Sequence, residues 1–136
     1  MSDRVLFLCT GNSCRSQMAE GFLRAWGGSR YEAYSAGTRP TDLNPMAVEV
    51  MREAGIDISG QRSKSAAEFL GRHFSYIITV CDNAKEHCPI FPGVSHRDHW
   101  PFQDPADAKG PETERRQAFR RVRDQIGARV RQFAGT

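Results

Sequence analysis

Apolar segments typical of β-strands alternate with amphipathic helical segments along the chain, and this alternation constrains the fold more than any other feature. Each apolar segment is short and ends at a glycine or a polar turn. The expected strands are 5–9, 31–36, 75–80 and a weaker 94–98, and the expected helices are 16–26, 44–55, 65–70 and a long C-terminal one. Strands that alternate with helices form a parallel sheet covered by helices.

The sequence therefore predicts a flavodoxin-like α/β fold with three layers (α/β/α) and a four-stranded parallel sheet of strand order 2-1-3-4. This winding brings the carboxyl ends of the first and third strands together, where ligands of such sheets bind. Cys9 ends the first strand and Cys81 follows the third. Adjacent strands lie about 4.8 Å apart, so we expect the two thiols to approach each other at this edge.

The stretch after the first strand predicts a cradle for an oxyanion. Small and polar residues lead directly into a helix, so successive N–H groups can turn toward one anion. Gly11 allows unusual dihedral angles, Asn12 tolerates a left-handed one, and the Arg15 fork matches a tetrahedral oxyanion. The predicted oxyanion-binding residues are Thr10, Gly11, Asn12, Ser13, Cys14, Arg15 and Ser16.

Cys9 is the candidate nucleophile of this cradle, because the strand delivers it there. The positive field of the cradle is expected to lower the pKa of Cys9 and make it a thiolate, and Ser16 is expected to donate a hydrogen bond to it. Cys14 is expected to be a half-buried residue of the loop wall. The alternative is a polar turn with a chance cysteine.

Cys81 and Cys88 form a second candidate constellation. If 82–88 were helical, the two Cα atoms would be roughly 10 Å apart, whereas a disulfide needs about 4.4–6.8 Å. A Cys81–Cys88 disulfide is therefore a poor structural cross-link. It is a plausible redox switch, because its formation would change the local fold. The alternative is a zinc site, although the ligand spacing matches no familiar zinc finger; its candidate ligands are Cys81, His87, Cys88, His96 and His99.

The chain resembles the thioredoxin-coupled arsenate reductases of the low-molecular-weight protein tyrosine phosphatase fold. The resemblance covers nearly the whole chain and is carried by the segments CTGNSCRSQMAEG, YSAGT, NPMAVEVMREAGIDIS, CDNAKEHCP, HWPFQDPA and RVRDQIGARVRQF. It implies that Cys9 attacks arsenate and that Cys81 then forms a disulfide with Cys9 and releases arsenite. Cys88 would next attack Cys81 and form a disulfide with it. Thioredoxin would reduce the resulting Cys81–Cys88 disulfide.

The resemblance also implies that Asp104 is the general acid that protonates the departing oxygen. Asp98 and Asp107 are the alternative acids, and an Asp-Pro pair also suits a simple turn. Phosphatases of this fold tend to carry aromatic residues after the Asp-Pro pair. The chain has Ala106, Asp107 and Ala108 there, which argues against a phosphotyrosine substrate.

Some members of the family hold potassium near positions that match Asn12, Glu20 and Ser35. The adjoining segment of this chain carries Arg62 and Lys64 where a carboxylate would be needed. We therefore expect no metal, and we hypothesise that Lys64 occupies this space as an internal cation.

Length and charge set the remaining expectations. The 136 residues suit a single domain, 1–136, and the net charge is only +3. The arginines of the C-terminal helix lie opposite its apolar face, so nucleic-acid binding is not expected. The short apolar N-terminal run predicts neither a signal peptide nor a membrane span. We expect a cytoplasmic monomer without a tightly bound cofactor; the alternatives to a reductase are a phosphatase of small phosphomonoesters and a thiol redox sensor.

Overall fold

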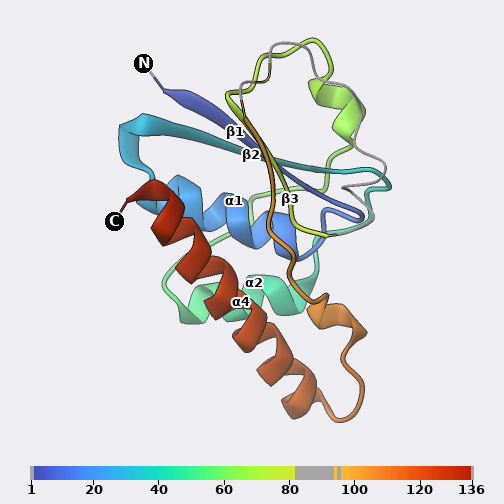
Figure 1. The fold of residues 1–136 in the computed structure, drawn as a ribbon. Coiled ribbons are helices and arrows are strands. Elements are labelled where there is room, and N and C mark those ends of the chain that lie inside the picture. The colour runs from blue at the N-terminus through green and yellow to red at the C-terminus, as the bar shows by residue number, and fades with distance from the viewer. Residues whose placement is uncertain (1, 82–93, 95, 136) are drawn as a thin grey trace.

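The computed structural model describes residues 2–81, 94 and 96–135 of the chain (Figure 1). The four strands are β1 (Asp3–Cys9), β2 (Tyr31–Gly37), β3 (Tyr76–Thr79) and β4 (His96–His99). The helices are α1 (Arg15–Trp26), α2 (Pro45–Glu53) and α4 (Glu112–Ala134), with short 3-10 turns η1 (Gly28–Arg30), η2 (Ala66–Phe69) and η3 (Pro105–Asp107).

The strands form one parallel sheet in the order β2-β1-β3-β4. The predicted α/β fold and strand order are therefore confirmed. In the register of the central strand, Cys9 lies beside Gly37 of β2 and Leu8 beside Thr79 of β3. Since Val5 to Cys9 are buried, β1 is the apolar centre of the sheet and delivers Cys9 to its carboxyl edge.

The helices α1, α2 and α4 lie on one side of the sheet (Figure 1). On that side Phe7 of β1 contacts Trp100, and Trp100 contacts Phe133 of α4. The opposite face carries η2, where Phe69 packs edge-on against Tyr34 of β2. Side chains alternate between the faces of a strand, so the sheet separates two apolar layers.

Local signals explain where the helices begin. The Asn44 side chain accepts a hydrogen bond from the Met46 N–H at 2.8 Å, and Pro45 occupies the first helical position of α2. The short helix expected at 65–70 forms as the 3-10 turn η2. Ser65 caps η2 and forms a reciprocal capping box with Glu68. The segment 82–88, for which a helix was considered, lies outside the described residues.

Among the described helices, none is both long enough and apolar enough to cross a membrane.

The helices α2 and α4 are joined by an exposed cluster of charges. Glu53 at the end of α2 accepts hydrogen bonds from Arg120 and from Arg123 of α4, at 2.7–3.0 Å. These arginines lower the pKa of Glu53 to about 2, the hydrogen bond from Arg120 being the largest cause. Glu53 therefore stays ionised in the folded chain at pH values where the unfolded chain protonates it.

This charge cluster predicts a loss of stability in acid. Because the folded pKa lies below the unfolded one, the contribution of Glu53 is present above about pH 4.5 and is lost as the pH falls toward about 2. Glu53→Gln should flatten the dependence of urea-unfolding free energy on pH in this window, while Glu114→Gln on α4 is the matched control. An unchanged pH slope in Glu53→Gln would contradict the assignment.

Candidate functional site

Asn12 fixes the loop that joins β1 to α1. It is fully buried and adopts the left-handed conformation expected for it, with φ of 51°. Its Nδ2 donates to the hydroxyls of Ser16 at 2.8 Å and Ser35 at 2.9 Å. Its Oδ1 accepts from Gln17 Nε2 at 3.0 Å and from the Lys64 N–H at 2.8 Å. One amide thus ties the loop to α1, to β2 and to the segment before η2.

The backbone carbonyl groups of residues 9–13 point away from the inside of the loop, toward neighbouring segments of the chain. The Asn12 carbonyl accepts from Ser63 Oγ at 2.7 Å. The segment 38–44 runs along the loop and donates four backbone hydrogen bonds at 2.8–3.1 Å: Thr38 to Cys9, Arg39 to Thr10, Thr41 to Gly11 and Asn44 to Ser13.

The N–H groups of the loop therefore face the other way. In a planar trans peptide the C=O of one residue and the N–H of the next point in opposite directions. The outward carbonyls of residues 9–13 hence turn the N–H groups of residues 10–14 to the inner side. Within the described part of the chain, no N–H of residues 11–14 donates a hydrogen bond. This is the arrangement that binds an anion.

Gly37 allows the loop to lie against the end of β2. A Cβ atom there would come within 2.5 Å of the Thr10 carbonyl oxygen and 3.0 Å of the Asn12 nitrogen. The Gly37 N–H also donates to the Lys64 carbonyl at 2.8 Å. The close approach is thus one that only glycine permits.

Arg15 closes the cradle and links it to Asp104. Its Nη1 donates to the Phe102 carbonyl at 3.0 Å, and its Nη2 lies 3.4 Å from Asp104 Oδ2. The other carboxylate oxygen of Asp104 accepts from the Ala106 N–H at 3.0 Å and caps η3. The buried Nε of Arg15 has no hydrogen-bond partner within the described residues. Arg15 therefore keeps one donor for an oxyanion while it holds the Asp104 segment.

The thiols of Cys9 and Cys81 meet, as the strand order predicts. Both side chains are buried, and a hydrogen bond joins the two. Cys81 Sγ also lies 3.3 Å from Thr10 Oγ1. The Cys9–Cys81 hydrogen bond, followed by burial, raises the pKa of Cys9, while Arg15 and the Thr10 N–H act in the opposite direction. The predicted lowering of this pKa is wrong, because it considered the loop without burial and without the Cys81 thiol, which comes from the segment after β3.

Cys14 behaves as part of the loop wall. It is buried, and its Sγ lies 3.6 Å from Ser13 Oγ. Burial raises the pKa of Cys14 to about 11. At neutral pH it therefore stays a protonated thiol.

Ser16 has a different partner from the one expected. Its hydroxyl accepts from Asn12 Nδ2, and a hydrogen bond to Cys9 does not occur among the described contacts. Ser16 thus supports the shape of the loop through Asn12.

Lys64 lies where the hypothesis of an internal cation puts it. Its Nζ is 3.5 Å from Glu20 Oε1, and the Lys64 side chain is only 12% exposed. Glu20 also accepts from Ser35 Oγ and from Arg24. The three residues Asn12, Glu20 and Ser35 are therefore connected, with an ammonium group beside them.

The alternative zinc ligands have other contacts where the structure describes them. The His96 ring stacks on Tyr76, and His99 Nδ1 lies 2.7 Å from Thr79 Oγ1. Among the described residues no three metal-binding side chains form a group. Cys88 and His87 lie outside the described residues.

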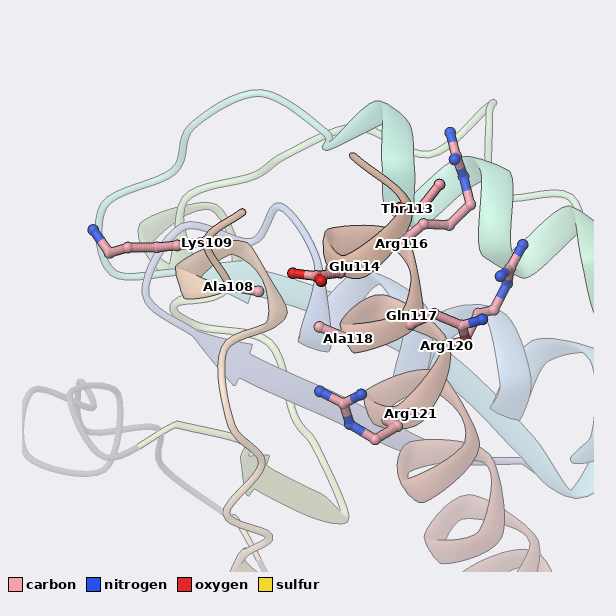
Figure 2. A pocket seen from close by; sticks show the side chains of 9 residues that line it. All are labelled: Ala108, Lys109, Thr113, Glu114, Arg116, Gln117, Ala118, Arg120 and Arg121. Atoms are coloured by element: carbon pink, nitrogen blue, oxygen red, sulfur yellow. The ribbon is translucent and has the colours of Figure 1, made fainter. Parts of the chain in front are cut away.

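A hollow of about 600 Å³ lies along the N-terminal half of α4 (Figure 2). The segment that carries Ala108 and Lys109 borders it on one side, and Glu114 and Arg121 border it on the other. None of the predicted site residues lines it.

Comparison with known proteins identifies the family. Residues 4–136 match the family described as low molecular weight phosphotyrosine protein phosphatase. The chain belongs to this family.

Arsenate reductases are among its similar proteins. The arsenate reductase of Shouchella clausii (strain KSM-K16) is 49% identical over 137 positions, which cover 100% of this chain and 99% of that protein. A solved arsenate reductase in the phosphate binding state superposes with a TM-score of 0.85 at 32% identity, over 98% of this chain and 97% of the other. The thioredoxin-dependent arsenate reductase of Corynebacterium glutamicum gives a TM-score of 0.75 at 28% identity, over 97% of this chain and 60% of that one.

Sequence reasoning missed two parts of the site. Gln17 is fully buried and donates to the Asn12 carbonyl and to the Arg62 carbonyl, at 3.0 and 2.8 Å. The segment 38–44, which binds the outward carbonyls, was not assigned a role. Neither had a local signal: Gln17 lies on the side of α1 that carries Glu20 and Arg24, opposite the apolar residues of the helix, and nothing local marked the segment 38–44.

The close approach at Gly37 predicts the effect of adding one methyl group. Gly37→Ala should destabilise the fold by about 1–3 kcal/mol, because the neighbouring atoms are backbone and cannot move aside. It should also weaken phosphate binding, since the loop must shift. Urea unfolding and isothermal titration calorimetry measure the two effects. Gly60→Ala is the matched control, because its Cβ would meet nothing within 4 Å; equal stability of the two variants would contradict the packing.

Proposed function

We propose that the chain reduces arsenate to arsenite through a relay of three cysteines, Cys9, Cys81 and Cys88, with thioredoxin as the reductant. The observation that carries the proposal is the contact between the buried Cys9 and Cys81 thiols, beside the anion-binding loop that follows Cys9. A phosphatase needs one thiol in such a cradle, whereas a reduction by thiols needs a second sulfur to complete a disulfide. The arsenate reductases among the similar proteins support the same substrate.

In the first step the cradle holds arsenate and Cys9 attacks the arsenic. The inward N–H groups of the loop and the free Nε of Arg15 are suited to bind the oxygens. The Cys9 thiol and dihydrogen arsenate give a Cys9–S–arsenic adduct and water. Because the pKa of Cys9 is raised, the thiol enters protonated and its proton leaves with the departing oxygen. Asp104, held 3.4 Å from Arg15, is the proposed acid that delivers it.

In the second step Cys81 attacks the sulfur of Cys9. The Cys9–Cys81 disulfide forms, the sulfur–arsenic bond breaks, and its electron pair stays on arsenic; the Cys81 proton goes to the arsenic oxyanion, which leaves as arsenite. The hydrogen bond between the two thiols places the attacking sulfur beside its target. The Thr10 hydroxyl contacts the same Cys81 sulfur, and a hydroxyl donor favours a thiolate.

In the third step Cys88 attacks Cys81, which frees Cys9 and leaves a Cys81–Cys88 disulfide. A thioredoxin dithiol then reduces this disulfide by exchange and becomes oxidised itself. The thioredoxin-dependent arsenate reductase of similar fold supports this choice of reductant. Thioredoxin therefore supplies the reducing equivalents in this proposal, and the reaction uses no tightly bound cofactor.

A second candidate function is hydrolysis of small phosphomonoesters. The family match and the anion cradle with Cys9 favour it, because both are shared with phosphatases. It would use Cys9, Arg15 and Asp104 but neither Cys81 nor Cys88.

Serine variants of the cysteines separate the two functions. With thioredoxin, thioredoxin reductase and NADPH, Cys81→Ser should form no arsenite, and Cys88→Ser should form one arsenite per chain and stop at the Cys9–Cys81 disulfide. Both variants should still hydrolyse p-nitrophenyl phosphate if the chain has that activity, and Cys9→Ser should lose both activities. Arsenite is measured by quenched-flow chromatography.

Cys14→Ser is the matched control for these variants. It removes a thiol that takes no part in the proposed relay and keeps the backbone N–H of position 14, so multiple turnover should persist. Multiple turnover by Cys88→Ser with thioredoxin as the only reductant would refute the third step.

The position of Lys64 beside Glu20 leads to a prediction about potassium. We propose that Lys64 acts as an internal cation, so activity and melting temperature should be the same in KCl and NaCl at equal ionic strength. Lys64→Ala should lower stability by about 1–3 kcal/mol, since a buried oxygen of Glu20 loses a charged partner. Potassium should recover part of this loss better than sodium. A potassium-specific gain in the unmodified chain would contradict the idea.

A further inference from the structure

A second hollow, of about 330 Å³, lies between α1, β2 and the segment 60–69. Three cations, one carboxylate and two aromatic rings line most of it: Arg24, Arg62, Lys64, Glu20, Tyr34 and Phe69. It includes none of the residues proposed to react with arsenate or to bind it.

The charges in this hollow do not balance. Glu20 is 4% exposed and serves both Arg24 and Lys64. Arg62 pairs at 2.8 Å with Glu68, which does not line the hollow. The single carboxylate of the lining thus faces more than one positive charge. Burial lowers the pKa of Lys64, Glu20 acts in the opposite direction, and repulsion by Arg62 and Arg24 adds to the lowering.

The lining has more hydrogen-bond donors than acceptors. An ammonium has three N–H bonds, and Lys64 Nζ uses two of them, on Glu20 Oε1 and the Arg62 carbonyl. A guanidinium has five N–H bonds. Arg24 donates three of its N–H groups, to Gln61 Oε1, Glu20 and the Ala33 carbonyl. Its other two N–H groups have no acceptor among the described residues.

A fourth cation stands at the aromatic side of the hollow. The Arg72 guanidinium lies 4.9 Å from the Tyr34 ring centre and 5.3 Å from that of Phe69. Its Nη2 donates to the Tyr34 hydroxyl at 3.3 Å, and it has no ion pair within the described ranges. Surplus positive charge and spare donors around a small hollow are the features that bind an anion.

We propose that this hollow binds a small oxyanion, a phosphate or a carboxylate, at a site separate from the cradle of Cys9. The site does not depend on the proposed reaction. It is connected to the cradle, because the Lys64 N–H donates to Asn12 Oδ1 and the Lys64 carbonyl accepts from Gly37, both at 2.8 Å. An anion that pairs with Arg62 and Lys64 steadies the segment that holds Asn12.

Amide chemical shifts test the site directly. Inorganic phosphate, and acetate in a parallel arm, are titrated into the ¹⁵N-labelled chain. The amides of Gly11 and Ser13 report the cradle, and those of Gln61 and Arg62 report the second site. The proposal expects saturable shifts in both sets with different midpoints. Saturation at the second site by phosphate, acetate or both supports the proposal and identifies the oxyanion class; saturation by neither overturns it.

Two variants separate the sites. Arg62→Gln should weaken binding at the second site about tenfold, as for a lost charge-assisted hydrogen bond, and leave the cradle midpoint unchanged. Arg52→Gln removes one exposed charge from α2 and is the matched control. Arg15→Met should abolish the cradle shifts and keep those of Gln61 and Arg62. Equal effects of Arg62→Gln and Arg52→Gln would overturn the site, and this comparison holds even if Arg15→Met does not fold.

Discussion

The buried amide of Asn12 is the interaction on which the candidate site depends. Asn12 itself has a left-handed backbone conformation. Its Nδ2 donates hydrogen bonds to Ser16 and Ser35, and its Oδ1 accepts hydrogen bonds from Gln17 and Lys64. A buried amide with unpaired groups would be costly, so the surrounding segments and the loop fix one another. The outward carbonyls and inward N–H groups follow from this conformation.

The chemistry of the site follows from where two buried thiols and one arginine lie relative to that loop. Arg15 anchors the Asp104 segment with one edge and keeps Nε for an anion. Cys9 and Cys81 share a hydrogen bond that stabilises the protonated pair. In the proposed route, Cys9 therefore keeps its proton until arsenate is bound, and the proton leaves with the departing oxygen.

Much of this arrangement could be predicted from the sequence. Apolar periodicity gave the strands, and the strand order then placed Cys9 beside Cys81 across seventy-two positions of chain. The pKa of Cys9 was predicted in the wrong direction, because a pKa depends on neighbours that arrive from other segments. For the same reason the segment 38–44 and Gln17 were missed: their roles are hydrogen bonds made across the fold, which leave no local pattern.

Oxidation of NADPH in the presence of thioredoxin reductase and thioredoxin tests the central claim most directly. The cysteine relay predicts that adding arsenate to the reduced chain starts continuous NADPH consumption, with one arsenite formed for each NADPH oxidised. Without arsenate, consumption should stop once any disulfide initially present is reduced. Consumption that does not respond to arsenate, or arsenate binding without any NADPH oxidation, would contradict the account.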